Sequence, residues 1–223
     1  CGYSLGQGEV MASNPLWCQP LSRWQYYFSD WIGDPQTKSL MLINNFLDMR
    51  PLHGDQDLWK GFRAHIHSQV SGNQIFLAAM AAHAVRPRPP IGFFRGFVLS
   101  GDGEHANTLD LKQQAIMPIV NLARLHALSC GSDAINTLKR LHSEANNPVL
   151  SSEGRHDLAD LFTLISALRA DHQGRQVLNG VTVDNYLNPT ELSSLERRHL
   201  KDAFVTLRTI QDAIAQGYQS DRF

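Results

Sequence analysis

The sequence predicts a mainly α-helical protein, a helical bundle with one short β-hairpin, and three observations support this fold class. Apolar residues recur every three or four positions over several long stretches, as they do on the buried face of a helix. Glycine and proline stand between these stretches, where helices end. Alternating segments of the kind that form strands are short and few. With 223 residues, 43% of them hydrophobic, the chain can bury a sizeable core in one or two domains.

One helix and one strand are expected near the N-terminus. Aromatic and aliphatic side chains follow helical spacing over residues 18–32, and Gly33-Asp34-Pro35 ends this helix. Residues 41–50 fit an extended strand, in which Asp48 points to the side opposite its apolar neighbours. A carboxylate in that position can hold a metal ion. A charge that only marks the end of a strand is the alternative that the pattern leaves open.

Two more helices are expected before the middle of the chain. Residues 58–70 carry an amphipathic pattern that stops near Gly72. Residues 73–85 are apolar on nearly every side, which indicates a buried helix. The proline-rich run over 86–90 ends this part, because proline lacks an amide hydrogen and disfavours helix in the residue before it.

The β-hairpin is predicted directly after this break. Its strands are the segments 93–99 and 108–111, and the turn-rich stretch 100–104 connects them.

The rest of the chain predicts an up-and-down bundle of helices. Helical patterns cover residues 115–129, 133–144 and 152–172. A last long helix begins at Ser193, whose hydroxyl and the carboxylate of Glu196 form a capping-box signature.

Four ordered blocks of the sequence resemble one known family, the signal-transduction nucleotidyltransferases of the domain-of-unknown-function 294 group. That group is similar to the uridylyltransferase of the PII protein and to glutamine synthetase adenylyltransferase. Together the blocks span nearly the whole chain, which makes the resemblance more specific than any one of them. The blocks are residues 1–17, residues 47–55, Leu109-Asp110-Leu111-Lys112 with residues 118–124, and Asp184-Asn185-Tyr186-Leu187 with Leu195-Glu196-Arg197-Arg198.

The resemblance implies a division into two parts and a reaction. Residues 1–54 would be the C-terminal remnant of a polymerase-β-like nucleotidyltransferase domain, with its terminal helix and strand. Residues 55–223 would be a helical substrate-binding domain. The complete protein would transfer a nucleoside monophosphate from an NTP to a protein or small-molecule acceptor, with Mg²⁺. Family members often carry CBS or cyclic-nucleotide-binding domains upstream, and these are the partners expected within the same parent protein.

Asp48 is the catalytic and metal-binding residue that the resemblance implies. Polymerase-β-like enzymes use a Gly-Ser turn, an Asp-x-Asp pair and a third carboxylate, and Asp48 matches only the third. Gly131-Ser132-Asp133 fits a helix stop and restart better than a triphosphate-binding turn. Because a single carboxylate is a poor Mg²⁺ site, we expect this chain to be the C-terminal piece of a longer enzyme and to be inactive alone.

Two short segments supply candidates for substrate binding. Asp110-Leu111-Lys112 matches the start of a family segment, although Met117-Pro118 stands where the family has Arg-Asp. Lys112 could place a positive charge near a nucleotide phosphate or a substrate carboxylate, and a solvated lysine is the alternative. Arg50, in the block that contains Asp48, is assigned to the same role.

A second group of candidates lies around the end of the long helix over 152–172. Its polar residues and a polar tripeptide after a short loop could form one wall of a pocket. A helix C-terminal cap followed by an Asx turn is the alternative. The residues are Arg169, Asp171, His172, Asp184, Asn185 and Tyr186, of which Asp171, His172, Asn185 and Tyr186 are assigned to substrate binding.

Composition argues against several classes of partner. A formal net charge of −1 offers no surface for polyanions, so nucleic acid is not expected. No apolar run is long enough to span a bilayer. Three cysteines, without a Cys-x-x-Cys pair, fit a reducing cytoplasm and give no sign of zinc. The ten histidines include His65 and His67, whose spacing places them on different helix faces, and they form no metal signature.

Two alternatives to an enzyme part remain at this stage. The first is a non-enzymatic regulatory module whose helices bind a partner protein. The second is a domain that mainly forms a homodimer through the apolar helix over 73–85, although burial in the core explains such a helix more simply.

Overall fold

The structure is a computed structural model, which describes residues 11, 14–101, 103–144 and 149–218. These residues are mainly helical, as the sequence predicted, and contain a small antiparallel sheet of two strands. The chain divides into two compact units, Cys1–Phe76 and Leu77–Phe223. The sequence-based division at residue 54 falls inside unit 1, between two of its helices.

Unit 1 consists of three α-helices after a short 3₁₀-helix, and α1 packs against both α2 and α3. Its core is aromatic: the ring of Phe28 is fully buried and meets Phe62 edge to face at 5.1 Å. Trp31 and Phe46 stack at 5.9 Å between centroids. The helical spacing of large apolar residues therefore produces one buried face on each helix. The elements are η1 Pro15–Trp17, α1 Leu21–Gly33, α2 Thr37–Phe46 and α3 Gln56–Val70.

The strand predicted over residues 41–50 is wrong, because most of this segment belongs to α2. Leu40, Ile43 and Leu47 are all buried, and their spacing of three and four residues is that of a helix. A strand would have placed only every second side chain in the core. Asp48 follows the helix in a turn and is half-buried.

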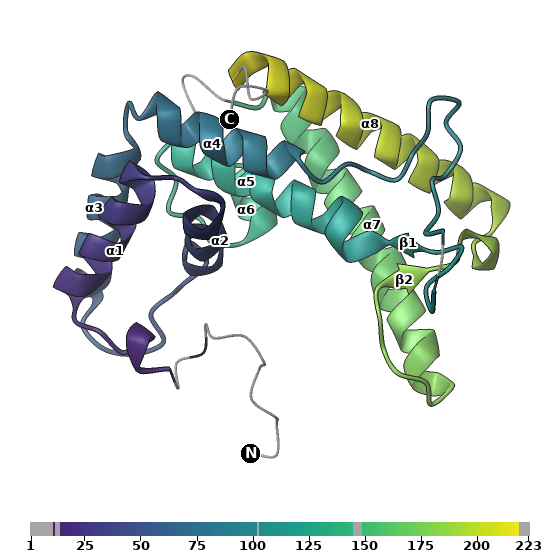
Figure 1. The fold of residues 1–223 in the computed structure, drawn as a ribbon, viewed down its shortest axis with the longest axis horizontal. Helices are drawn as coiled ribbons and strands as arrows, with labels where there is room; N and C mark the ends of the chain where they lie inside the picture. Colours follow the sequence, from purple (N-terminus) through teal and green to yellow (C-terminus); the bar gives the residue numbers. More distant parts are fainter. Residues whose placement is uncertain (1–10, 12–13, 102, 145–148, 219–223) are drawn as a thin grey trace. The chain divides into compact units, whose positions relative to one another are not determined.

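Unit 2 is built from long helices around α5, which is buried on most sides (Figure 1). Leu122 and Leu125 on α5 and Phe204 on α8 are fully buried. α6 and α8 each pack against α7. The elements are α4 Gln74–Val85, which begins in unit 1, then β1 Leu109–Asp110, η2 Lys112–Ile116, α5 Met117–Ser129, α6 Thr137–Leu141, α7 Ser152–Leu178, β2 Tyr186–Leu187, η3 Pro189–Glu191 and α8 Ser194–Tyr218.

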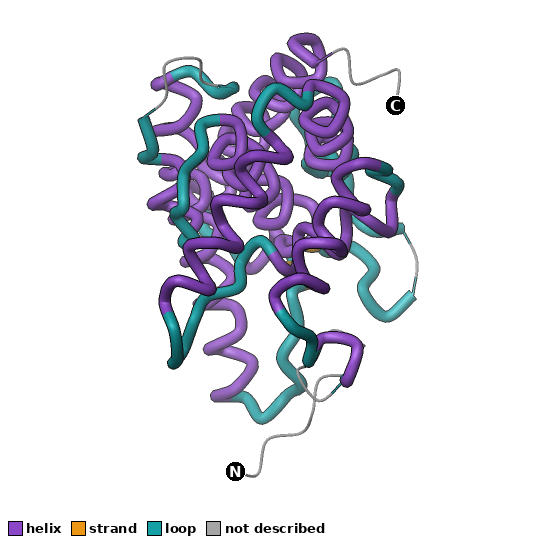
Figure 2. The backbone as a smooth tube through the Cα atoms, turned by 90° about the vertical axis from the view of Figure 1, so that its left-hand side faces the viewer, coloured by secondary structure: helices purple, strands orange, loops and turns teal. Residues whose placement is uncertain are grey.

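The predicted β-hairpin is only partly correct. The segment over 108–111 does contain a strand, but β1 pairs with β2, which follows α7 in the sequence, with Leu109 opposite Leu187 (Figure 1). Helix dominates the backbone drawn in Figure 2. Residues 93–99 contribute a single bridge, Ile91 to Phe97, in place of a strand. Both leucines of the β1–β2 pair are fully buried, so burial of this pair selects the distant partner.

Helix ends follow the local signals closely. Gly131 has a positive φ of 66°, and the amide of Ser132 donates to the carbonyl of Ala127 at 2.8 Å, which ends α5 as a glycine C-cap does. Ser193 and Glu196 exchange the two hydrogen bonds of a capping box at the start of α8, at 3.2 and 2.8 Å. Both predicted ends are confirmed.

Two other helices differ in length from their predicted ranges. α7 continues six residues beyond residue 172, and α6 is limited to five residues. The first sequence block lies mostly among residues 1–10 and 12–13, outside the described residues. Within the described ranges, no helix is both long and apolar enough to cross a membrane.

Candidate functional site

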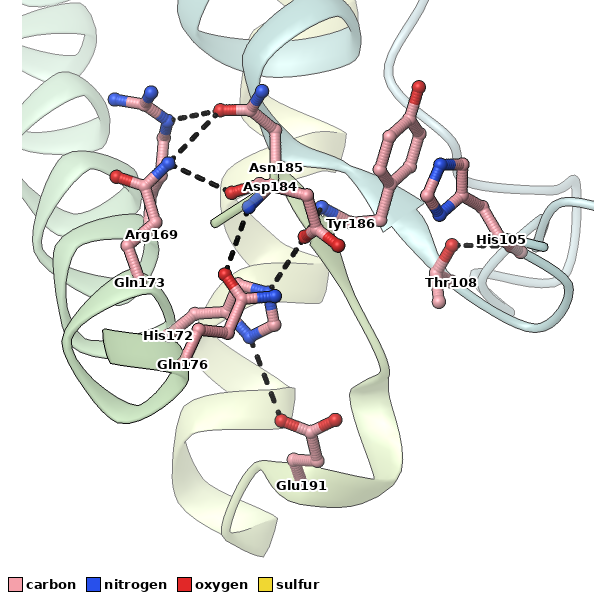
Figure 3. A network of polar contacts seen from close by, with 10 residues as sticks. All are labelled: His105, Thr108, Arg169, His172, Gln173, Gln176, Asp184, Asn185, Tyr186 and Glu191. Carbon is pink, nitrogen blue, oxygen red and sulfur yellow. Dashed lines mark hydrogen bonds and ion pairs between the residues drawn. The ribbon is translucent and has the colours of Figure 1, made fainter. Parts of the chain in front are cut away.

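A polar cluster forms where the C-terminal half of α7 meets the segment that contains β2 (Figure 3). Arg169, Gln173 and Gln176 follow one another at four and three residues along α7, so they lie on the same helix face. Each makes a hydrogen bond to Asp184 or Asn185. Because the contacts involve both backbone and side chains, the segment before β2 is held along this face of α7.

Arg169 and Asn185 make the shortest of these contacts. The Nε of Arg169 donates to Oδ1 of Asn185 at 2.6 Å, and Gln173 donates to the same oxygen at 3.4 Å. Gln173 also donates to the carbonyl of Asp184 at 2.8 Å. The orientation of the Arg169 guanidinium is therefore set by Asn185, while its two terminal amino groups have no partner among the described residues.

His172 lies between two carboxylates. Its Nε2 is 3.1 Å from Oδ1 of Asp184, and its Nδ1 is 3.7 Å from Oε2 of Glu191. The histidine side chain is buried, whereas Asp184 and Glu191 are partly exposed. The 3.7 Å separation is too long for a hydrogen bond, so Asp184 is the direct partner of His172.

Asp184 is stabilised in its charged form. Burial by itself would raise the pKa of this carboxyl, but the hydrogen bonds from the Tyr186 amide, His172 and Gln176 together lower it. The amide of Tyr186 donates to Oδ1 of Asp184 at 2.9 Å, two residues apart, which is the geometry of an Asx turn. The predicted Asx turn is thus present, and it forms part of the cluster.

The β1–β2 pair joins a second segment to this cluster. The ring of Tyr186 stacks on the imidazole of His105 at 3.5 Å between centroids. Asp110 lies opposite Tyr186 in the sheet, and its carboxylate accepts the amide of Gln113 at 2.9 Å. The amide of Leu111 donates to the carbonyl of Asn185 at 3.1 Å. The next residue in the chain is Lys112, which is exposed.

The structure brings together most of the residues that the sequence assigned to substrate binding in this part of the chain. Asp171 is the exception within α7: it is exposed and forms an ion pair with Arg175 at 3.1 Å, along the helix. Asp48 and Arg50 belong to unit 1. The residues that come together are Asp110, His172, Asn185 and Tyr186, with Arg169 and Asp184, and Lys112 follows Leu111, whose amide bonds to Asn185.

Sequence reasoning missed four members of the cluster: His105, Gln173, Gln176 and Glu191. Two of them had a usable signal, because Gln173 and Gln176 continue the helical spacing of Arg169 once α7 is extended beyond residue 172. His105 and Glu191 had none, since only the tertiary structure brings them to Tyr186 and His172.

A metal site does not form within the described part of the chain. Groups of three or more histidine, cysteine, aspartate or glutamate side chains placed for a metal ion are absent there. Asp48 alone therefore does not fit a complete Mg²⁺ site, which needs further oxygen ligands.

Fold and site together define a helical unit with a polar cluster at the C-terminal half of α7. Residues 74–218, more than half of the chain, match the family described as "Putative nucleotidyltransferase substrate binding domain". Residues 1–38 match the family described as "Putative nucleotidyltransferase DUF294". The chain therefore belongs to this nucleotidyltransferase family, and its C-terminal part is the substrate-binding domain. Comparison with curated proteins and with solved structures gave no significant match.

Proposed function

We propose that this chain is the acceptor-side part of a signal-transduction nucleotidyltransferase, which transfers a nucleoside monophosphate from an NTP to a protein or small molecule. The observation that carries the proposal is that the polar cluster on α7 lies inside residues 74–218, the part that matches a substrate-binding domain. Asp48 as catalytic residue and Mg²⁺ ligand belongs to the same proposal for the complete enzyme. Mg²⁺ there would neutralise charge on the triphosphate.

Arg169 is the residue we assign to direct contact with the acceptor. Its terminal amino groups can donate two parallel hydrogen bonds to a carboxylate, phosphate or carbonyl group. Lys112, exposed beside the same segment, adds a second positive charge. His172 and Asp184 act as positioning residues, because they hold the segment that carries Asn185.

Calorimetry first tests which part of the enzyme binds the nucleotide. We expect Mg²⁺ with ATP or UTP to bind tightly to the full-length parent and not to bind at the α7 cluster of this chain alone. Tight binding of either nucleotide at the α7 cluster of this chain would contradict the proposal, because the cluster would then be a nucleotide site. An Arg169→Ala variant of this chain shows whether any binding depends on the cluster.

Transfer of a labelled nucleotide tests the acceptor role. In the full-length parent, Arg169→Ala should raise the KM for the acceptor at least tenfold and leave the Kd for the NTP unchanged. Arg175→Ala is the matched control, since Arg175 is an exposed arginine on the same helix, paired with Asp171. Equal acceptor kinetics in the two variants would overturn the assignment of Arg169.

A dimer through the apolar helix is not part of this proposal, because burial within the chain explains most of the apolar side chains of α4. Phe76, Met80, Ala81 and Ala84 on α4 are nearly fully buried within the chain. A helix whose apolar side chains are already covered has little left to offer a second copy.

A further inference from the structure

Unit 1 contains a pocket that is lined by three tryptophans and a phenylalanine among other residues. Its volume is about 420 Å³, and small-molecule sites occupy roughly 300–1,000 Å³. The walls come from η1, the start of α1, the loop after α2 and the first turns of α3. All of these elements belong to unit 1, so the pocket is separate from the polar cluster on α7.

Three tryptophans line the pocket. Trp24 is half-buried and packs against the rings of Phe46 and Phe62, with ring centroids 4.8 Å and 6.3 Å apart. Trp59 is half-buried too, and the guanidinium of the buried Arg63 lies 5.9 Å from its ring centroid. Trp17 completes the aromatic lining from η1. These contacts hold the indoles in place, so they present preformed flat surfaces that remain partly open to solvent.

A positively charged side chain lies at the same pocket. Arg50 lines it, is exposed, and has no ion pair within the described ranges. His53 is a second basic side chain in the wall. Asp55 also lines the pocket and keeps its negative charge, which lies at the N-terminus of α3, where its carboxylate caps the helix by accepting the Asp57 amide at 2.8 Å. Arg50 is thus the positively charged group available to a ligand.

We propose that this pocket binds a planar aromatic ring that carries a negatively charged group, with the ring against the indoles of Trp24 and Trp59 and the anion at Arg50. Flat aromatic rings stack on indoles, and a guanidinium pairs with phosphate or carboxylate through two parallel hydrogen bonds. Two kinds of compound share this chemistry, nucleotides and aromatic carboxylates. The inference is independent of the proposed acceptor role of unit 2.

The proposal is tested by the binding of AMP and indole-3-acetate to the 223-residue chain. Uncharged adenosine serves as the comparison. We expect one or both anions to shift the indole N–H resonances of Trp17, Trp24 and Trp59 in NMR spectra. The resonance of Trp31, which is buried and does not line the pocket, should stay in place. A response to AMP alone identifies the phosphate source, and a response to indole-3-acetate alone identifies the carboxylate source.

Two variants and two controls locate the site. Trp59→Ala should weaken binding roughly tenfold, the size of one lost stacking contact. Arg50→Ala should remove the preference of the pocket for AMP over adenosine. The controls are Tyr26→Ala, an exposed aromatic residue on α1, and Lys60→Ala, an exposed cation on α3, neither of which lines the pocket. Far-ultraviolet circular dichroism confirms that each variant is folded.

The proposal is overturned if neither probe shifts the three indole resonances at millimolar concentration. It is also overturned if binding is the same in folded Trp59→Ala and Arg50→Ala as in the unchanged protein. Either result leaves the acceptor role of unit 2 untouched, because that role is tested with Arg169.

Discussion

The imidazole of His126 on α5 is fully buried, and among the described residues only one of its nitrogens has a hydrogen-bond partner. Its Nε2 lies 3.0 Å from the carbonyl of Ser143, while Nδ1 has no partner in the part of the chain that the structure describes. Burial lowers the pKa of His126, and nearby Arg155 lowers it further, against the opposing effect of the Ser143 hydrogen bond. The histidine is therefore neutral in the folded protein at neutral pH.

This lowered pKa makes stability depend on pH. The unfolded chain takes up a proton on His126 near pH 6.5, whereas the folded chain does so only at lower pH. The stability that neutral His126 contributes is thus fully present above pH 6.5, and it decreases as the pH falls from 6.5 towards the folded pKa. Urea unfolding at pH 7.5 and 5.5 should show a smaller loss of stability in His126→Gln than in the unchanged protein.

The control for this prediction is His142→Gln, because His142 is exposed. It should keep the pH dependence of the unchanged protein. His83, whose pKa is also lowered by burial and by Arg86 and Arg124, accounts for the dependence that remains in His126→Gln. An identical loss in the His126 and His142 variants would contradict the assignment.

Asp184 is an acidic residue, and the stability that it contributes changes with pH over a lower range than that of His126. Hydrogen bonds lower the pKa of this carboxyl below its ordinary 3.8, despite burial, so its contribution is present above about pH 4 and is lost as the pH falls through the folded pKa. Asp184→Asn keeps an oxygen for the Tyr186 amide but removes the charge beside His172. We expect thermal unfolding to show a loss of about 1 kcal/mol at pH 7.

That loss should become smaller as the pH falls below 3.8, because the unchanged carboxyl takes up a proton as the pH passes through its lowered folded pKa. Asp171→Asn is the control, since Asp171 is exposed and pairs only along its helix. A loss that stays constant from pH 7 down to the acid unfolding transition would mean that shape, and not charge, is what Asp184 supplies.

At the scale of single elements, the start of α8 shows how local sequence sets a helix boundary. The Ser193 hydroxyl accepts the Glu196 amide, and the Glu196 carboxylate accepts the Ser193 amide. These bonds lower the pKa of Glu196. Both partners lie within four residues, so this boundary needed no tertiary information to be predicted.

Removing this cap should have a measurable cost. Ser193→Ala is expected to destabilise the chain by about 1 kcal/mol, because the Glu196 amide at the start of α8 loses its partner. Ser194→Ala, one residue into the exposed first turn, should cost much less. Chemical denaturation checks both variants, and equal losses would contradict the role of the cap.

Elements that depend on distant partners were harder to predict. The segment that contains α2 was expected to be a strand, because Asp48 between apolar neighbours fits the alternation of a strand, whereas Leu40, Ile43 and Leu47 follow helical spacing. β1 was expected to pair within a hairpin, whereas its partner β2 follows α7. A two-residue strand carries too little pattern to identify its partner.

At the scale of the whole molecule, each unit has its own core. Phe28 is fully buried in unit 1 and Phe204 is fully buried in unit 2. Truncating either ring to alanine should cost about 3–5 kcal/mol within its own unit. In calorimetry we expect Phe28→Ala and Phe204→Ala to lower two different unfolding transitions. One transition that both variants lower equally would show that the units unfold together.

By itself, the sequence determined the helical class, most helix boundaries and the family, because apolar spacing, caps and short blocks are local properties. It also named several residues of the polar cluster, though not that they meet. Only the tertiary structure brought Arg169 to Asn185, His172 to Asp184 and His105 to Tyr186, and left Asp171 outside. Contacts between distant segments depend on how elements pack, and packing selects partners that no local pattern encodes.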